Sequence, residues 1–237
     1  MEVIEKKIEV PEQNGSIIVI EGACDGMGKT TQYSMLKGRL QEDGYELYTH
    51  HFPSYGTYHG RPVEEYIKGD LGKAGVASPY LISSLYAVDK AIVWNKEMRD
   101  AWKNGKVLLL DRYTTSSLIY QSAMITDPVA KREFIDYICE FEYEKLGIGK
   151  PDDVIFLHAP FDLVTLMRNA RKNNEGVEKD IHEVDLEYMK KVYESAMFVA
   201  DHLGWSAVRC DRDGKMKSID EIHDDVFKLV KKNLGKK

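Results

Sequence analysis

A glycine-rich turn near the beginning of the chain has the residue types and the spacing that hold phosphate groups. Glycine lets the backbone point its N–H groups toward phosphate oxygens, and a lysine beside it reaches the terminal phosphates. A threonine hydroxyl directly after the lysine can ligate magnesium. We therefore expect a nucleotide-phosphate site in which Thr30 binds the metal and which consists of Asp25, Gly26, Met27, Gly28, Lys29, Thr30 and Thr31.

The turn departs from the usual phosphate-loop pattern, G-x-x-x-x-G-K-[ST], at its first glycine. Counting five residues back from Gly28 gives Ala23, and Gly22 lies one residue too early. Either Ala23 tolerates the backbone angle at this position, or the loop has gained one residue. An apolar run before the turn and a helical pattern after it are the context that the motif requires, and they favour a phosphate loop.

A carboxylate and an arginine follow a second apolar run, Val107 to Leu110. A carboxylate at the end of a buried strand beside a phosphate loop holds the metal, directly or through water, so we expect Asp111 to be a metal ligand. Arg112 can bind a phosphate group through two parallel hydrogen bonds. The alternative is that Asp111 caps the next helix and Arg112 forms a surface ion pair.

These two features are compatible with ATPases, GTPases and kinases. A GTPase would carry a guanine-reading Asn-Lys-x-Asp late in the chain, and the nearest string, Asn95-Lys96-Glu97-Met98, lacks the aspartate. The small size of the chain and its two separate sets of cationic residues favour a kinase that acts on a second small, phosphate-bearing substrate.

The elements that must position these residues alternate along the chain. Short apolar runs alternate with segments of helical periodicity, which predicts a parallel sheet with helices on both faces. We expect a single domain over residues 16–237, preceded by an extension over residues 1–15. The predicted strands are 17–20, 45–50, 107–110, 154–157 and 207–209, and the predicted helices are 30–41, 79–103, 129–145, 160–171, 187–203 and 219–234.

Composition excludes several classes of protein. The 237-residue chain has a formal net charge of -6, which disfavours binding to long nucleic acid, whose affinity comes largely from basic patches. Its longest apolar runs are far shorter than the roughly 20 residues that a membrane span needs. The cysteines, Cys24, Cys139 and Cys210, lie far apart and lack the spacing of a disulfide framework, which favours the cytoplasm.

Taken together, the motifs resemble those of the thymidylate kinases (dTMP kinases), which are nucleoside monophosphate kinases with a P-loop NTPase fold. The matching pieces are the glycine-rich turn, Phe52-Pro53, the run from Tyr86 to Lys90, and the run from Asp111 to Gln121. The resemblance implies a three-layer α/β fold with a five-stranded parallel sheet wrapped by helices, and a short lid at about residues 168–183. It also implies a homodimer that transfers the γ-phosphoryl group of ATP to dTMP with magnesium, giving dTDP and ADP.

The same resemblance implies an acceptor site. Tyr86 stands where the family usually stacks a phenylalanine on the thymine ring, and Lys90 stands where an arginine usually reaches the base carbonyl. Gln121 would contact the base edge, and Tyr120 would lie against the sugar. The full set of implied substrate-binding residues is Phe52, Pro53, Tyr86, Lys90, Arg112, Ser117, Tyr120 and Gln121.

Family members supply a positive charge to the migrating phosphoryl group either from the phosphate loop or from the lid. The loop of this chain contains no arginine, so we expect the charge to come from Arg168, Arg171 or Lys172 at the start of the lid. The resemblance places Arg112 at the acceptor phosphate, and Asp25 is expected near the acceptor or the metal. The expected catalytic residues are Lys29, Arg112, Arg168, Arg171 and Asp25.

Two alternatives remain open. Tyr86 and Lys90 depart from the family pattern, which also suits a deoxynucleoside kinase or another nucleoside monophosphate kinase with an altered base preference. The irregular phosphate loop also suits a regulator that binds nucleotide without catalysis.

Overall fold

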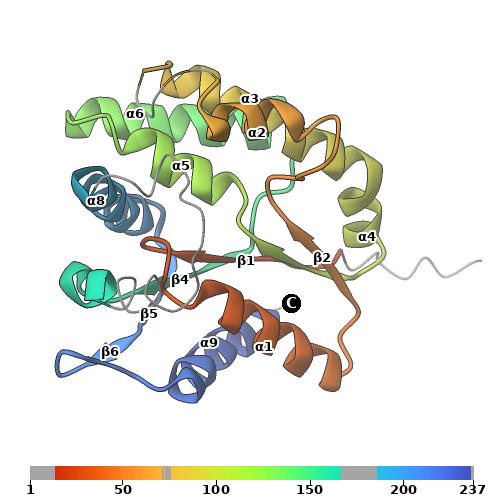
Figure 1. The fold of residues 1–237 in the computed structure, drawn as a ribbon. Coiled ribbons are helices and arrows are strands. Elements are labelled where there is room, and N and C mark those ends of the chain that lie inside the picture. Colours follow the sequence, from red (N-terminus) through yellow and green to blue (C-terminus); the bar gives the residue numbers. More distant parts are fainter. Residues whose placement is uncertain (1–13, 71, 73–75, 167–185, 236–237) are drawn as a thin grey trace, which may run out of the picture.

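A five-stranded parallel sheet forms the centre of the computed structural model, which describes residues 14–70, 72, 76–166 and 186–235 (Figure 1). The strand order is β2-β3-β1-β4-β5. Adjacent strands are all parallel, so their carboxyl ends meet at one edge of the sheet. The strands are β1 (Ile17–Gly22), β2 (Leu47–His51), β3 (Val107–Asp111), β4 (Asp153–His158) and β5 (Ser206–Arg209). A short antiparallel pair follows, β6 (Asp211–Arg212) with β7 (Lys215–Met216).

Helices connect the strands, and two of the helical segments continue into π-helical turns, η1 (Trp94–Met98) and η2 (Glu140–Lys145). The labelled α-helices are α1 (Lys29–Glu42), α2 (Arg61–Lys68), α3 (Pro79–Val93), α4 (Arg99–Lys103), α5 (Thr114–Ser122), α6 (Pro128–Cys139), α8 (Leu186–Leu203) and α9 (Ile219–Leu234). Residues 161–166 are also helical. None of the helices in the described ranges is both long and apolar enough to cross a membrane.

Strand β1 is buried on both faces because helices cover each side of the sheet. Alternate side chains of a strand point to opposite faces. Ile18 and Ile20 pack in the core beneath α1 and α9, whereas Ile17 and Val19 pack in the core that includes Trp94 of η1. Figure 1 shows α1 and α9 on one face of the sheet and α3 and α5 on the other. This two-sided burial explains why β1 is a continuous apolar run rather than an alternating one.

The predicted fold class and all five predicted strands are confirmed, with strand ends that differ by at most two residues. The helix predicted over 79–103 is continuous from α3 through η1 to α4, and the helix predicted over 129–145 is α6 followed by η2. The predictions did not include α2, α5 or the β6–β7 pair. The predicted lid and most of the predicted extension, residues 1–13, lie outside the described residues, as does the end of the helix predicted over 160–171.

Candidate active site

The phosphate loop leaves β1 at the carboxyl edge of the sheet and enters α1 at Lys29. Its left-handed backbone angles fall on Gly26 (φ 96°) and Gly28 (φ 78°), and Ala23 has no such angle. Glycine adopts this conformation without the steric cost that other residues bear. The Ala23 N–H donates to the Leu157 carbonyl of β4 over 2.9 Å. Ala23 therefore lies in the loop without a backbone angle that requires glycine.

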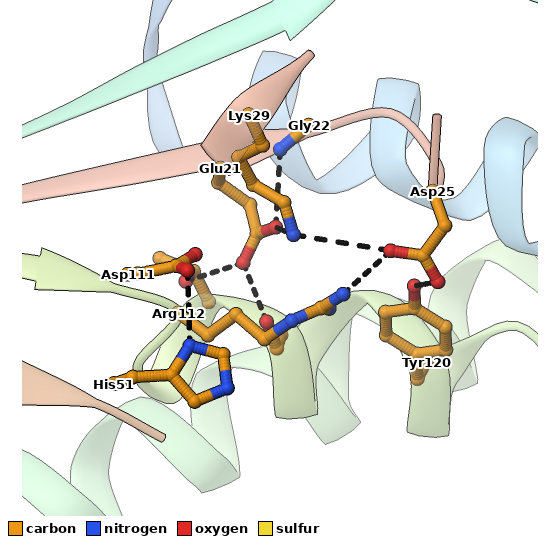
Figure 2. Close-up of polar contacts among 10 residues, drawn as sticks. Glu21, Gly22, Asp25, Lys29, His51, Asp111, Arg112 and Tyr120 are labelled. Carbon is orange, nitrogen blue, oxygen red and sulfur yellow. Dashed lines mark hydrogen bonds and ion pairs between the residues drawn. The ribbon is translucent and has the colours of Figure 1, made fainter. Parts of the chain in front are cut away.

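Lys29 begins α1 and is directed back over the loop. Its Nζ lies 3.7 Å from Glu21 Oε1 and 3.9 Å from Asp25 Oδ1 (Figure 2). The side chain is buried, while Thr30 beside it is exposed. A cation held at the start of a helix, next to loop N–H groups, is the arrangement that binds the anionic phosphates of a nucleotide.

Glu21 is a buried carboxylate that was not predicted as part of the site. Its Oε1 accepts a hydrogen bond from the Gly22 N–H over 3.0 Å. Its Oε2 accepts from the hydroxyl groups of Thr115 over 2.9 Å and Ser116 over 2.6 Å. Glu21 thus ties the phosphate loop to the first turn of α5. The available signal was a glutamate at the end of an otherwise apolar strand.

Arg112 and Asp25 are brought together from β3 and the phosphate loop. Arg112 has a left-handed backbone (φ 64°), which is uncommon for a residue with a side chain. Strained conformations of this kind cluster at active sites. Its Nη2 donates to Asp25 Oδ1 over 2.5 Å, and the Tyr120 hydroxyl donates to Asp25 Oδ2 over 3.0 Å (Figure 2). Burial alone would raise the pKa of Asp25, but the charges of Arg112 and Lys29 outweigh it and hold this pKa well below its ordinary value.

Asp111 ends β3 and lies beside His51, the last residue of β2. The Nδ1 atom of His51 lies 2.9 Å from Asp111 Oδ2 (Figure 2). Burial raises the pKa of Asp111, but the hydrogen bond with His51 and the charge of Lys29 together lower it below its ordinary value. Asp111 therefore stays ionised at neutral pH. Its other oxygen, Oδ1, is buried and has no hydrogen-bond partner among the described residues.

The donor set suits magnesium. No group of three or more His, Cys, Asp or Glu side chains that could hold a metal occurs in the described part of the chain. Magnesium at a nucleotide site needs fewer protein ligands than that, because phosphates and water complete its octahedral shell. The unpartnered Oδ1 of Asp111 and the exposed hydroxyl residue Thr30 are the groups that fit such a site.

A cavity of about 200 Å³ opens beside the phosphate loop. Asp25 and Arg112 line it on the side of the loop, and its lining also includes His51, Tyr55 and Asp89, which were not predicted. All eight residues that the family resemblance implies for the acceptor site line this cavity: Phe52, Pro53, Tyr86, Lys90, Arg112, Ser117, Tyr120 and Gln121.

Two charged groups in the cavity wall are already paired. Lys90 Nζ lies 2.8 Å from Glu142 Oε1 and donates to Ser117 Oγ over 3.2 Å. Asp89 Oδ2 accepts from the Ser54 N–H over 2.8 Å, and its Oδ1 lies 2.6 Å from His59 Nδ1. Asp89 thereby fastens the segment after Phe52-Pro53 to α3. Neither Glu142 nor His59 was predicted as part of the site, because their partners are distant in sequence.

The predicted catalytic residues fall into two groups. Lys29, Asp25 and Arg112 lie together where the phosphate loop meets the cavity. Arg168 and Arg171 lie outside the described residues, as does Lys172, which was the third candidate for the lid charge.

Comparison with known proteins gives a consistent result. A family model described as thymidylate kinase matches residues 20–225. The chain is 28% identical over 220 residues to the thymidylate kinase of Thermoanaerobacter sp. (strain X514), covering 93% of this chain and 99% of the relative. It is 29% identical over 221 residues to a probable thymidylate kinase of Pyrococcus abyssi, covering 93% and 98%. A solved structure of thymidylate kinase from Candida albicans shares the fold, with a TM-score of 0.69 at 20% identity, and the match covers 93% of this chain and 92% of that one.

Proposed function

The chain belongs to the thymidylate kinase family, and we propose that the site described above transfers the γ-phosphoryl group of ATP to dTMP, giving dTDP and ADP. One observation carries the assignment of residues: the Arg112–Asp25 ion pair joins the phosphate loop to the acceptor cavity. Donor and acceptor phosphates can therefore meet at this junction.

In this reaction a phosphate oxygen of dTMP attacks the γ-phosphorus of ATP, and the bond from that phosphorus to the β-phosphate oxygen breaks. The acceptor phosphate is already a competent nucleophile, so the protein mainly aligns two anions and offsets their repulsion. Lys29 and the N–H groups of the loop would hold the β- and γ-phosphates. Arg112 would bind the acceptor phosphate through its remaining N–H groups.

Asp25 and Tyr120 would position Arg112 rather than touch the transferred group. The Asp25 carboxylate accepts from both side chains, so it fixes the guanidinium at the boundary between the two substrates. Its depressed pKa keeps it charged throughout the neutral range. An arginine oriented before the substrate arrives loses less conformational entropy on binding.

The remaining lining residues would surround the nucleoside of dTMP. Phe52, Pro53 and Tyr86 supply apolar and aromatic surface for a planar base, and Gln121 supplies an amide that can donate and accept. Tyr120 would lie against the sugar.

Thr30 and Asp111 would hold magnesium, which when bound neutralises charge on the β- and γ-phosphates. The family resemblance also assigns a lid to residues 168–183, from which Arg168 or Arg171 would reach the transferring group. Closure of such a lid excludes water and limits hydrolysis of ATP.

The outer face of α3 supports a homodimer. Leu81 and Val88 are 51% and 52% exposed, and Leu85 and Ile92 are half-buried along the same side of the helix. This spacing forms one apolar stripe. We propose that two copies of the chain pair through it. The three cysteines are free, which supports a cytoplasmic location.

A substrate panel tests the proposed reaction. The protein would be incubated with ATP, magnesium and a series of nucleosides and nucleoside monophosphates, and ADP and the new nucleotide would be measured. We expect dTMP to be the preferred acceptor. Preference for another monophosphate or an unphosphorylated nucleoside would support a kinase with altered base choice, and ATP binding without transfer would support a regulator.

A further inference from the structure

Lys90 of α3, which lines the acceptor cavity, forms a buried ion pair with Glu142 of η2. The Lys90 and Glu142 side chains are 2% and 0% exposed, and Nζ lies 2.8 Å from Oε1. Moving two charges out of water costs several kcal/mol for each ion, and their attraction often does no more than offset this cost. Such a pair is weak evidence for added stability, so its position at the cavity suggests a role in binding.

Glu142 is held rigidly by its surroundings. Its Oε2 accepts from the Thr114 hydroxyl of α5 over 2.5 Å, while its backbone carbonyl accepts from the Ile148 N–H over 3.0 Å. The residue lies in η2, and π-helical turns of this kind occur frequently at functional sites. Three elements, α3, α5 and η2, therefore converge on one carboxylate.

This carboxylate holds the Lys90 ammonium by charge, with Nζ 2.8 Å from Oε1. An ammonium group has three N–H donors and no acceptor. Ser117 Oγ accepts one hydrogen bond from it over 3.2 Å, whereas Glu142 Oε1 is an ion partner 2.8 Å away that has no hydrogen-bond partner among the described residues. Lys90 also lines the cavity. The ammonium therefore has N–H donors left for a ligand in the cavity, and the nearby Glu142 carboxylate offsets its charge.

We propose that Glu142 is a positioning residue for base selection: it holds Lys90 so that one N–H meets a ring carbonyl of the acceptor base. A thymine or uracil ring offers a carbonyl oxygen where cytosine has an amino group. The amino group of cytosine would point its N–H donors at the N–H donors of Lys90. A buried N–H would then stay unpaired, which costs binding energy. The cavity thus favours keto pyrimidines over amino pyrimidines. This inference rests on the proposed function, because it assumes that the cavity binds a pyrimidine monophosphate.

Two variants separate base selection from a purely structural role. Glu142→Gln removes the charge that positions Lys90. The double variant Lys90→Met with Glu142→Leu replaces the whole pair with apolar side chains, a change that often leaves stability unaltered or improved. Glu140→Gln is the matched control, since Glu140 lies in the same π-helical turn but forms an exposed pair with Lys145.

The measurements are kcat and KM for dTMP and dCMP, direct binding of both monophosphates without ATP, and thermal unfolding. Loss of one hydrogen bond to a charged group should lower the dTMP to dCMP ratio of kcat/KM by about tenfold or more in Glu142→Gln, mainly through KM for dTMP. The double variant should regain the unfolding temperature of the wild type but not its base selectivity. Glu140→Gln should match the wild type in both respects.

A double variant that folds and keeps the wild-type ratio would overturn the inference, as would a folded Glu142→Gln protein with unchanged selectivity. A wild-type protein that binds dTMP in preference to dCMP but transfers no phosphoryl group would overturn the proposed reaction. The same result would support base selection by Lys90 and Glu142. A wild-type protein that transfers the phosphoryl group to dTMP and dCMP equally well would support the kinase reaction and overturn the proposed base selection.

Discussion

The Arg112 guanidinium donates to the Asp25 carboxylate over 2.5 Å, although the two residues are 87 positions apart in the chain. The contact links the residue after β3 to the middle of the phosphate loop. Arg112 faces the acceptor cavity, and Asp25 also lies near Lys29. A change at either residue should therefore affect both substrates of the reaction, although by different amounts.

Replacing Arg112 with alanine should impair transfer much more than it impairs ATP binding. Loss of one strong donor to a developing or bound anion typically lowers turnover by about 10² to 10³. Steady-state kinetics with dTMP and calorimetric titration with ATP measure the two effects. Arg61→Ala is the control, because Arg61 forms an exposed ion pair with Glu65 on α2. Turnover like that of the wild type would contradict the acceptor role.

Replacing Asp25 with asparagine should change how stability depends on pH. The pKa of Asp25 in the folded protein lies below its ordinary value of 3.8, so the unfolded chain binds the proton more readily. The carboxylate thus stabilises the fold above the ordinary pKa, and this contribution is lost as the pH falls through the folded pKa. The free-energy difference between wild type and Asp25→Asn should be constant from about pH 5 to 8 and should shrink below about pH 4.

Urea unfolding at a series of pH values measures this difference. Asp70→Asn, at an exposed position after α2, provides the comparison and should show no such change. A difference that grows toward acid pH would contradict the assignment.

Removing magnesium with a chelator should abolish transfer, and Asp111→Asn should raise the magnesium concentration needed for half-maximal activity. Loss of a group that supports a metal commonly weakens metal affinity by about 10- to 100-fold. Initial rates at increasing magnesium concentration give this value. Asp100→Asn on the exposed side of α4 should leave the curve unchanged. An identical curve for Asp111→Asn would exclude Asp111 as a ligand.

Placing a charge on the α3 stripe should separate the proposed dimer. Val88→Glu would bury a carboxylate against the partner copy without a counter-ion, which is costly. Light scattering after size-exclusion chromatography would then report the mass of one chain instead of two. Ile219→Glu changes an equally exposed apolar residue on α9, at the other face of the sheet, and should leave the mass unaltered. A wild-type protein that runs as a monomer would refute the proposal.

The sheet and the phosphate loop could be predicted from sequence because their signals are local. Ile17 to Ile20 and Val107 to Leu110 are uninterrupted apolar runs, and Gly26 and Gly28 mark the places where the backbone must turn. Helix α5 was not predicted because its sequence carries no such local signal. It contains Thr114, Thr115 and Ser116, which are weak helix formers, and it is buried on several sides, so it shows no amphipathic period.

The polar partners within the site could not be predicted, because they depend on tertiary contacts. Glu21 meets Thr115, Asp89 meets His59, and Lys90 meets Glu142, and in each case the two residues come from different elements. A glutamate such as Glu142 has the same local pattern as the exposed glutamates beside it. Glu142 is buried because the fold places it beside Lys90 and Thr114, which are both distant from it in sequence.

The central position of β1 has a consequence for the chain as it is synthesised. β1 pairs with β3, which begins at Val107, and with β4, which begins at Asp153. Until both have left the ribosome, the backbone groups of β1 lack their strand partners and its apolar side chains lack their cover. A nascent chain that ends before β4 therefore lacks the Leu157 carbonyl that anchors Ala23. We therefore expect the phosphate loop, although it is translated early, to gain nucleotide affinity only after β4 has been synthesised.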